Sequence, residues 1–349
     1  MKAWRVHGFG EPEDTFVVDD VPEPTPAELG GMSMDLSGWV PVGPGREPFA
    51  DWVMLRMLVG ALALPDVTMS RGTYPVPVAR PYTSGQEGVG VVVDAAPARR
   101  SLIGKRVAAV TMQPWGSLAP VSIGVSTIFE VPADMTDEEA GAFLIPAHTA
   151  YHAAVRRGQV RAGETVAVLG AAGGLGSALV QICLAQGARV IAVVGNAEKA
   201  AFCARLGAEP VDHSAGDFVA AVRALTGGRG VDVIVDPVQG ESGAAARAFL
   251  VPDGRHVVCG HAGGLVPHDP HFYLYNHTLV GATLGSYPRD EMTRIHAETH
   301  SALLALVAAG RYRPTVERCV TFDEVPAALA DLAGRRTTGR VVVRIAPAD

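Results

Sequence analysis

Residues Glu164 to Val194 read ETVAVLGAAGGLGSALVQICLAQGARVIAVV, and this stretch decides the fold. It opens with the apolar run Thr165–Leu169, as expected of a strand that is covered on both faces of a parallel sheet. A glycine-rich turn follows, and an amphipathic helical pattern then runs to Gly187, a residue type that commonly ends helices. Arg189–Val194 forms a second apolar run. Strand, glycine turn, helix and strand together predict a mononucleotide-binding unit.

The glycine turn carries the pattern Ala171-x-Gly173-x-x-Gly176, with alanine in place of the first glycine of the usual fingerprint. Small side chains there leave the N–H groups at the helix start open to a pyrophosphate. A glycine-rich loop that only closes an α/β unit is the alternative interpretation. The flanking strands and helix favour dinucleotide binding. The residues predicted to contact the cofactor are Ala172, Gly173, Gly174, Leu175 and Gly176.

The composition excludes several other classes of protein. The chain has 349 residues, 48% of them hydrophobic, and a formal charge of −7 without a basic stripe, so nucleic acid is not an expected partner. The most apolar run, Trp52–Leu64, contains Arg56 and is too short to span a bilayer. The N-terminus shows no secretory pattern, and the four cysteines lie far apart with no CxxC pair. These features predict a reduced, cytoplasmic protein without a membrane partner.

Residues 1–130 predict a small β-rich barrel. Short apolar runs are divided there by Gly and Pro, and little helical pattern is present. The candidate strands are Lys2–Val6, Trp52–Leu58, Gly88–Ala95, Arg106–Thr111 and Ser122–Val131. The long segment Gly30–Pro48 contains Trp39 and has two interpretations. It is either a lid that contacts substrate or a surface loop with one packed aromatic ring.

Residues 131–284 alternate helical patterns with apolar strands and predict a doubly wound parallel sheet, the Rossmann arrangement, with six strands. Residues 285–349 return to a β-rich pattern that ends at a strand over Arg340–Ile345. We expect this tail to rejoin the first barrel. The α/β cofactor domain would then be inserted between two halves, 1–130 and 285–349, of a β-rich catalytic domain.

The ordered motifs GAAGGLGSALVQICLAQGARVIAVV, EKAAFCARLGAE, LTGGRGVDVIVDPVQG, PDGRHVVCGHAGG, LVGATLGS and TTGRVVV resemble the medium-chain dehydrogenase/reductase superfamily over nearly the whole chain. PDVTMSRGTYP and SGQEGVGVVV are similar to its zinc-free branch, which includes quinone oxidoreductases and enoyl thioester reductases. The resemblance implies a GroES-like barrel, an active site in the cleft between the domains and a homodimer. It also implies that Gly260 and His261 lie at the cofactor.

The zinc ligands of the zinc-dependent relatives are missing at the matching positions. A catalytic zinc needs about three protein ligands from Cys, His and carboxylates. Ala61-Leu62-Ala63-Leu64-Pro65 offers no cysteine, and Gln86 stands where those relatives have the histidine of Gly-His-Glu. The lobe that holds four cysteines in those relatives has none here. We therefore predict no metal.

Without zinc, another donor has to assist the chemistry, and the resemblance points to Tyr74. Enoyl thioester reductases have a tyrosine at the position of Tyr74 in Arg71-Gly72-Thr73-Tyr74-Pro75. The Asn and Tyr of quinone oxidoreductases are replaced by Ala63 and Thr68. Tyr74 as a packed residue of a barrel turn remains an alternative. His148 is either a proton source or a buried, hydrogen-bonded histidine, and Trp115 and Tyr82 are expected in the substrate pocket by analogy alone.

The resulting interpretation is a zinc-independent reductase that transfers hydride from NADPH to a small conjugated carbonyl compound, namely a quinone, an enone or an enoyl thioester. Gly195-Asn196 stands where NAD-binding relatives have an acidic side chain that holds the ribose, so no charge there repels a 2′-phosphate. Lys199 starts the next helix, where its ammonium can meet that phosphate, and both features favour NADPH. Glu198 is the counter-argument, since its carboxylate offers a ribose acceptor. The alternatives are a vestigial NADPH-binding protein that acts through partners and a metal-free alcohol or imine dehydrogenase.

Overall fold

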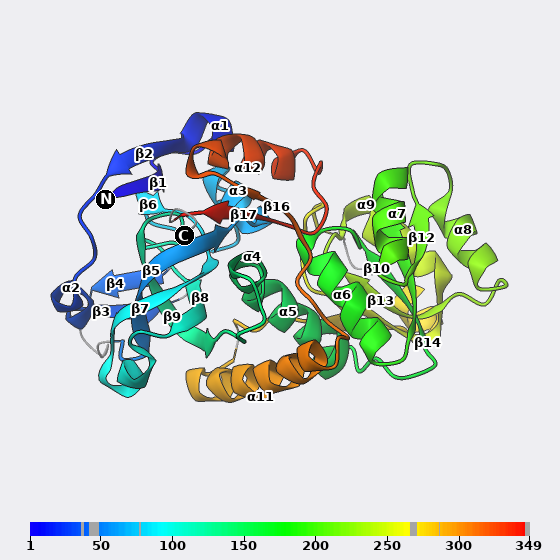
Figure 1. Ribbon diagram of the computed structural model, residues 1–349. Helices are drawn as coiled ribbons and strands as arrows, with labels where there is room; N and C mark the ends of the chain where they lie inside the picture. Colours follow the sequence, from blue (N-terminus) through cyan, green and yellow to red (C-terminus); the bar gives the residue numbers. More distant parts are fainter. Residues whose placement is uncertain (36–37, 42–48, 77, 266–270, 286, 346–349) are drawn as a thin grey trace. The chain divides into compact units, whose positions relative to one another are not determined.

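The computed structural model describes residues 1–35, 38–41, 49–76, 78–265, 271–285 and 287–345. It divides the chain into two compact units (Figure 1). The first unit combines Met1–Ile145 with Val316–Asp349, and the second comprises Pro146–Thr315. The second unit is therefore inserted between two parts of the first, as the sequence predicts.

A six-stranded sheet forms the centre of the first unit, in the order β16-β17-β5-β7-β8-β9. Its strands are β5 (Trp52–Ala61), β7 (Glu87–Ala95), β8 (Arg106–Thr111), β9 (Val121–Glu130), β16 (Val316–Val320) and β17 (Arg340–Arg344). A further pairing of β5 with β9 closes β5, β7, β8 and β9 into a small barrel. Strand β17 pairs antiparallel with β5, so the C-terminal strands join this sheet and the predicted return of the tail is confirmed.

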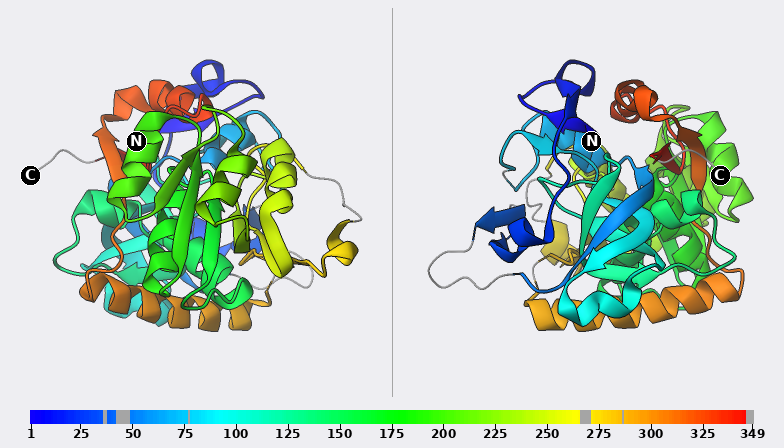
Figure 2. Two further views of the ribbon diagram at one scale, coloured as in Figure 1. Left: turned by 90° about the vertical axis from the view of Figure 1, so that its right-hand side faces the viewer. Right: turned by 60° about the vertical axis from the view of Figure 1, so that its left-hand side comes forward.

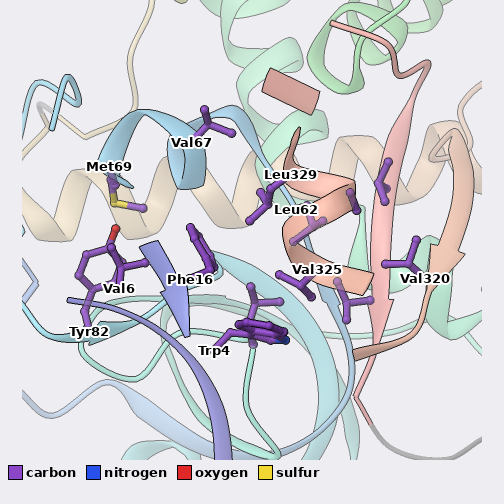
Figure 3. Close-up of a cluster of buried hydrophobic side chains, with 14 residues drawn as sticks. Trp4, Val6, Phe16, Leu62, Val67, Met69, Tyr82, Val320, Val325 and Leu329 are labelled. Atoms are coloured by element: carbon purple, nitrogen blue, oxygen red, sulfur yellow. The ribbon is translucent and has the colours of Figure 1, made fainter. Parts of the chain in front are cut away.

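A second sheet of the first unit has the order β2-β1-β6, from β1 (Lys2–Val6), β2 (Phe16–Asp20) and β6 (Tyr82–Thr83). Apolar side chains of β1, of α3 (Leu64–Ser70) and of α12 (Val325–Ala333) pack into one core cluster (Figure 3). Trp4 lies in this cluster, and its indole Nε1 donates a hydrogen bond to the Phe322 carbonyl at 2.7 Å. The core thus joins residues from both ends of the chain.

The remaining helices of this unit are α1 (Pro12–Thr15), α2 (Pro26–Gly30), η1 (Pro97–Leu102), α4 (Asp137–Gly141) and η4 (Phe322–Glu324).

The second unit contains a fully parallel six-stranded sheet, in the order β12-β11-β10-β13-β14-β15. The strands are β10 (Thr165–Leu169), β11 (Arg189–Val194), β12 (Glu209–Asp212), β13 (Val231–Asp236), β14 (Leu250–Val258) and β15 (Thr278–Gly281). This order reverses direction next to β10, which is the switch point at which such sheets bind dinucleotides. The predicted doubly wound fold is confirmed.

Helices follow the strands in the second unit, and the left view of Figure 2 looks toward this part of the chain. They are η2 (His152–Arg157), α6 (Gly174–Ala185), α7 (Ala197–Arg205), α8 (Phe218–Leu225), α9 (Gly240–Ala246), η3 (Arg247–Phe249), α10 (His271–Leu274) and α11 (Arg289–Ala308). Helix α5 (Leu144–Tyr151) begins in the first unit and continues into the second. None of the helices in the described part of the chain combines the length and apolarity needed to cross a membrane.

The boundaries between the units differ from the sequence prediction of 130/131 and 284/285. The structure divides the chain after Ile145 and after Thr315. Helix α4 packs against β5 and β7 and thus belongs to the barrel, whereas α11 belongs to the second unit. A helical pattern in the sequence shows which residues are apolar but not which sheet they cover, so helices next to a boundary are easily assigned to the wrong side.

The segment Gly30–Pro48 is more regular than the predicted loop. Strands β3 (Met32–Asp35) and β4 (Gly38–Pro41) form an antiparallel ladder, with Met32 opposite Pro41. Residues 36–37 and 42–48 lie outside the described residues, as does the side chain of Trp39. A lid role for this segment remains a prediction.

Candidate functional site

The glycine turn after β10 has the geometry of a phosphate-binding turn. Gly173 is the N-cap of α6, and no side chain caps the helix there. A Cβ atom on Gly176 would lie 2.1 Å from the Gly170 carbonyl oxygen, so only glycine fits at that position. The start of a twelve-residue helix therefore approaches β10 closely and presents its N–H groups without a blocking side chain. The turn fits the pyrophosphate of a dinucleotide.

Two loops at the carboxyl ends of β13 and β14 lie beside each other in the same unit. A Cβ on Gly240 would lie 2.2 Å from the Gly263 carbonyl oxygen, and a Cβ on Gly260 would lie 2.6 Å from the Pro237 carbonyl oxygen. Gly260 is thus required by close backbone contact. The predicted cofactor residue His261 follows it and is exposed.

Asp236, which the sequence analysis missed, holds the first of these loops. Its carboxylate accepts hydrogen bonds from the Val238 and Gln239 amides at 2.7 Å each and from His256 Nε2 at 2.9 Å. Burial acts to raise the pKa of Asp236, but these hydrogen bonds outweigh it and keep the pKa below its ordinary value. Asp236 could have been found in the sequence, because it is an acidic residue at the last position of a largely apolar strand.

The end of β11 brings polar and cationic residues together. Asn196 caps α7, and its Oδ1 accepts a hydrogen bond from the Lys199 amide at 2.9 Å. His213 follows β12, and its Nε2 lies 3.3 Å from the position that a Cβ on Gly195 would occupy. Lys199 and His213 therefore both lie near the end of β11, where the ribose of a bound dinucleotide is held in this fold. His213 was not predicted from the sequence.

A cavity of about 150 Å³ lies within the first unit. Apolar side chains form much of its wall, and four polar residues complete it. The lining residues are Met69, Tyr74, Val78, Gln86, Val110, Thr111, Met112, Gln113 and Ile145. Tyr74, which the sequence analysis singled out, is thus one of the residues that line this cavity. Gln113 was not predicted, because no motif marks it.

Buried polar contacts position Gln86 at this cavity. The carboxylate of Asp66 accepts hydrogen bonds from the Ala63 amide, the Ser84 hydroxyl and the Gly85 amide at 2.8–3.0 Å, which ties α3 to the turn before Gln86. Burial raises the pKa of Asp66 although these hydrogen bonds oppose it. A Cβ on Gly85 would lie 2.2 Å from Ser117 Oγ, so the turn requires glycine. Gln86 is thus held on a rigid support.

The positions at which relatives bind zinc carry no metal-binding side chains here. Ala63 is a buried alanine that caps α3, and the Gln86 amide donates to the Met69 sulfur at 3.9 Å. In the described part of the chain, no group of three or more His, Cys, Asp or Glu residues is arranged to hold a metal ion. The residues present do not fit a catalytic zinc.

His148 belongs to a cluster of buried histidines in the second unit. Its Nδ1 lies 3.0 Å from His296 Nδ1, and its Nε2 lies 3.3 Å from His300 Nδ1. The two partners thus contact opposite nitrogens of one ring, and the three rings do not converge on a common point. This geometry favours the hydrogen-bonded structural interpretation of His148 over that of a proton source.

Tyr82 and Trp115 are not among the residues that line the described cavity. Tyr82 is fully buried in the core cluster of Figure 3, and burial raises its pKa far above the ordinary value. Trp115 packs against a separate apolar cluster around Trp52. Tyr82 is therefore a core residue and does not line this cavity, because core packing and substrate contact favour the same residue types. A substrate contact of Trp115 stays a prediction.

The second unit has a parallel sheet of the dinucleotide-binding type, with a glycine turn at its switch point, and is inserted in a barrel unit. This combination defines a class of dehydrogenases that use a nicotinamide dinucleotide. Comparison with known proteins identifies the group more closely. Residues 174–300 match the family model described as zinc-binding dehydrogenase. The rat quinone oxidoreductase-like protein 2 is 29% identical over 285 residues, which cover 80% of this chain and 81% of the relative.

Two solved structures resemble the chain over nearly its full length. A probable oxidoreductase from Mycobacterium abscessus is 32% identical, with a TM-score of 0.79 and coverage of 99% of this chain and 98% of that one. The quinone oxidoreductase from Thermus thermophilus, solved also as a complex with NADPH, is 30% identical, with a TM-score of 0.78 and coverage of 99% and 100%. The chain belongs to the quinone oxidoreductase branch of the medium-chain dehydrogenase/reductase superfamily.

Proposed function

We propose that this protein is a zinc-independent, NADPH-dependent reductase of conjugated carbonyl compounds. The observation that carries this proposal is the cavity of the first unit, where the phenol of Tyr74 and the carboxamides of Gln86 and Gln113 lie among apolar walls without a histidine, cysteine or carboxylate. Such a lining suits a neutral, polarised acceptor. A steady-state screen of NADPH oxidation across quinones, enones and enoyl thioesters tests the proposal, and no turnover of any of them would contradict it.

The residues of the second unit fit the cofactor. The open helix start at Gly173 suits a pyrophosphate. Lys199 suits a 2′-phosphate because its ammonium is positively charged, and His213 beside it offers a ring N–H donor. The complex of the Thermus thermophilus relative with NADPH supports the same choice. Bound NADPH would supply hydride to the β-carbon of an enone or to a quinone ring.

Tyr74 is the residue that we propose assists this reduction. When hydride adds to the β-carbon, the electron pair of the C=C bond moves toward the carbonyl oxygen, and the α-carbon then takes a proton. The phenol O–H of a tyrosine is a hydrogen-bond donor that reaches a carbonyl oxygen without help from a metal. The Tyr74 amide donates to the Thr68 carbonyl at 3.1 Å, which holds the residue against α3.

Replacing Tyr74 with phenylalanine is expected to lower kcat at least about tenfold on enones and enoyl thioesters, since general acid catalysis typically contributes about 10²- to 10⁴-fold. KM is expected to change much less, because only the hydroxyl is removed. Quinones take protons readily from water and should be affected less. Steady-state kinetics of the purified variant provide the measurement. Wild-type rates on every accepted substrate would make Tyr74 a packing residue.

The purified enzyme is expected to contain no stoichiometric zinc and to keep its activity in the presence of a chelator. The reason is the donor set described above, in which Ala63 and Gln86 occupy the ligand positions. Elemental analysis of the protein, with activity measured before and after treatment with EDTA, tests this. About one zinc per chain, together with loss of activity on its removal, would refute it.

A homodimer is the expected assembly. Strand β15 ends the sheet order of the second unit, and Leu279 on this strand is 53% exposed. Tyr273, Leu274 and Tyr275 just before it are exposed as well. An apolar strand at a sheet edge is a template for pairing with a second copy. Sedimentation equilibrium should give twice the chain mass, and Leu279→Lys should shift it to one chain. A monomeric wild-type protein would rule the dimer out.

The cytoplasmic location also stays a prediction. Its support is that all four cysteines are free, as expected in a reducing compartment. Cell fractionation of the native host provides the test, and recovery in a secreted fraction would contradict it.

A further inference from the structure

The loop after β13 contains a residue in a backbone conformation that normally requires glycine. Gln239, which directly precedes α9, has a φ of 59° and a ψ of −147°. Residues other than glycine rarely adopt a positive φ, and this region of backbone conformations is essentially restricted to glycine. Strained backbone of this kind persists only where the surrounding contacts hold it in place, and it is concentrated at functional sites. Gln239 therefore calls for both a structural cause and a role.

A buried carboxylate holds Gln239 in this conformation. Asp236 Oδ1 accepts a hydrogen bond from the Gln239 backbone amide, and Asp236 Oδ2 accepts one from the side-chain Nε2 of the same residue, each at 2.7 Å. His256 Nε2 donates to that Oδ2 atom at 2.9 Å, and neither Asp236 nor His256 is exposed. Hydrogen bonds to an ionised acceptor are among the stronger ones in proteins. The Gln239 side chain thus fastens its own strained backbone to the interior of the second unit.

The peptide group between Val238 and Gln239 is fixed from both sides. Its N–H donates to Asp236, and its carbonyl oxygen accepts a hydrogen bond from the Gly263 amide at 2.6 Å. A flip of this peptide would break both contacts at once. Val238 Cγ2 lies 2.9 Å from the position that a Cβ on Gly170 would occupy, so the loop lies against the start of the glycine turn. The conformation of Gln239 therefore sets the shape of the loop beside that turn.

The place of this loop in the sheet assigns it to one half of a bound dinucleotide. The sheet order reverses next to β10, and a dinucleotide binds across the crevice at such a switch point. Its pyrophosphate would face the start of α6, and its adenosine ribose would lie at the end of β11, on one side of β10. Strand β13 lies on the other side of β10. The nicotinamide half, beyond the pyrophosphate, would therefore extend toward the loop after β13.

We infer that Gln239 is a positioning residue, which acts through Asp236 and His256 to hold the loop Val238–Gly240 in the shape that receives the nicotinamide half of the dinucleotide. A loop that has this shape before binding loses less conformational freedom when the cofactor binds. The inference goes beyond the proposed function, because it concerns the cofactor and does not depend on the acceptor. It predicts that the backbone conformation at Gln239 matters for binding, rather than a direct contact of its side chain.

The test measures the binding of NADPH and of adenosine 2′,5′-bisphosphate to Gln239→Met and Gln239→Gly by titration calorimetry, without any acceptor. The bisphosphate contains the adenosine half of NADPH and lacks the nicotinamide half. Methionine keeps the cost of a positive φ and removes the amide that offsets it, so the loop should relax. NADPH should then bind at least about tenfold more weakly. Glycine adopts a positive φ at no steric cost, so Gln239→Gly should bind NADPH within about threefold of wild type. Both variants should bind the bisphosphate within about twofold of wild type, which also shows that they are folded.

Gln159 provides the matched control, since it is another glutamine of the second unit with a positive φ, 48°. It is exposed and precedes β10, at the end of the strand away from the glycine turn. Gln159→Met and Gln159→Gly should leave both dissociation constants unchanged. Hydrogen exchange of peptides that cover Val238–Gly243, without ligand, reports on the loop directly. Exchange should be faster in Gln239→Met than in wild type and close to wild type in Gln239→Gly.

Three results would overturn the inference. Equal weakening of NADPH binding in Gln239→Met and Gln239→Gly would show that the side chain itself contacts the cofactor. Equal weakening of the bisphosphate and of NADPH in Gln239→Met would show general damage to the second unit. Wild-type affinity of Gln239→Met for NADPH would show that the shape of the loop does not matter. An enzyme that reduces no quinone, enone or enoyl thioester would refute the proposed reductase and leave these binding results, and thus the inference, unaffected.

Discussion

Lowering the pH from 8 to 5 is expected to reduce the free energy of unfolding of this protein by several kcal/mol, through the buried histidines of the second unit. His148, His152, His296 and His300 are all at most 9% exposed. Burial lowers the pKa of His152, His296 and His300 to about 4. Burial and the two neighbouring imidazoles lower the pKa of His148 as well.

The sign of the effect follows from which state binds more protons. In the unfolded chain a histidine has a pKa of about 6.5, whereas in the folded chain His152, His296 and His300 stay neutral down to about pH 4. Between these values the unfolded state binds more protons, so stability falls as the pH falls and is constant above about pH 7.5. Each of the three rings with a pKa of about 4 contributes roughly 2 kcal/mol at pH 5, and His148 acts in the same direction.

The charged groups around the cluster add to this cost. Arg156 and Arg157 act on His152 and lower its pKa further, after burial. Glu298, on the same helix as His296, pairs with Arg156 at 2.9 Å and with Arg294 at 2.6 Å. That carboxylate is therefore already neutralised by arginines. Protonated histidines would find no free acidic partner among these neighbours, and α11 should separate from α5.

Urea unfolding between pH 8 and pH 5, with hydrogen exchange of α11 peptides as a local probe, measures the effect. His152→Phe should flatten the pH dependence and stabilise the protein, since both ring nitrogens of His152 are buried without a hydrogen-bond partner among the described residues. The ring contact of His152 with Tyr287 suits phenylalanine equally. His261→Gln is the exposed control. An unchanged slope in His152→Phe would show that other groups control the acid response.

Replacing Lys199 with alanine is expected to weaken NADPH binding by about 10- to 150-fold and to leave NADH binding nearly unchanged, because a charge-assisted contact contributes roughly 1.5–3 kcal/mol. Lys199 lies in the first turn of α7, directly after the Asn196 cap at the end of β11. An ammonium at that point meets the 2′-phosphate that only NADPH carries. Titration calorimetry with both cofactors gives the two dissociation constants.

Two variants on the same helix serve as controls. Arg205 lies in the last turn of α7, so Arg205→Ala removes the same charge away from the ribose end and should change neither constant. Glu198→Gln tests the competing assignment, in which that carboxylate accepts a hydrogen bond from the ribose. Equal losses for both cofactors in Lys199→Ala, or tighter binding of NADH than NADPH by wild type, would overturn the NADPH assignment.

The secondary structure could be predicted closely because it depends on neighbours in the chain. The expected strands Lys2–Val6 and Arg106–Thr111 are observed at those residues, and the helical pattern expected to run to Gly187 forms α6, which ends at Ala185. Period-two and period-3.6 patterns reflect which face of an element is buried, and glycines mark the ends. The same local logic located the phosphate-binding turn at Gly173 and Gly176.

The site in the first unit was predictable only in part. Tyr74 and Gln86 were found because they lie in segments that resemble relatives. Gln113 has no such segment, and its position in the cavity wall depends on contacts of its loop with Thr83 and Ser84, which precede it by about thirty residues. Tyr82 shows the converse error, since a tyrosine expected in the pocket is fully buried in the core.

The sequence by itself determined the order of strands and helices, the parallel sheet and its glycine turn, because each depends on side chains a few residues apart. Only the tertiary structure decided that α11 belongs to the second unit, that His148 meets His296 and His300, and that the Gln113 amide is buried beside a cavity. Contacts between residues far apart in the chain leave no periodic trace in the sequence. Whether a polar side chain finds a hydrogen-bond partner depends on those contacts.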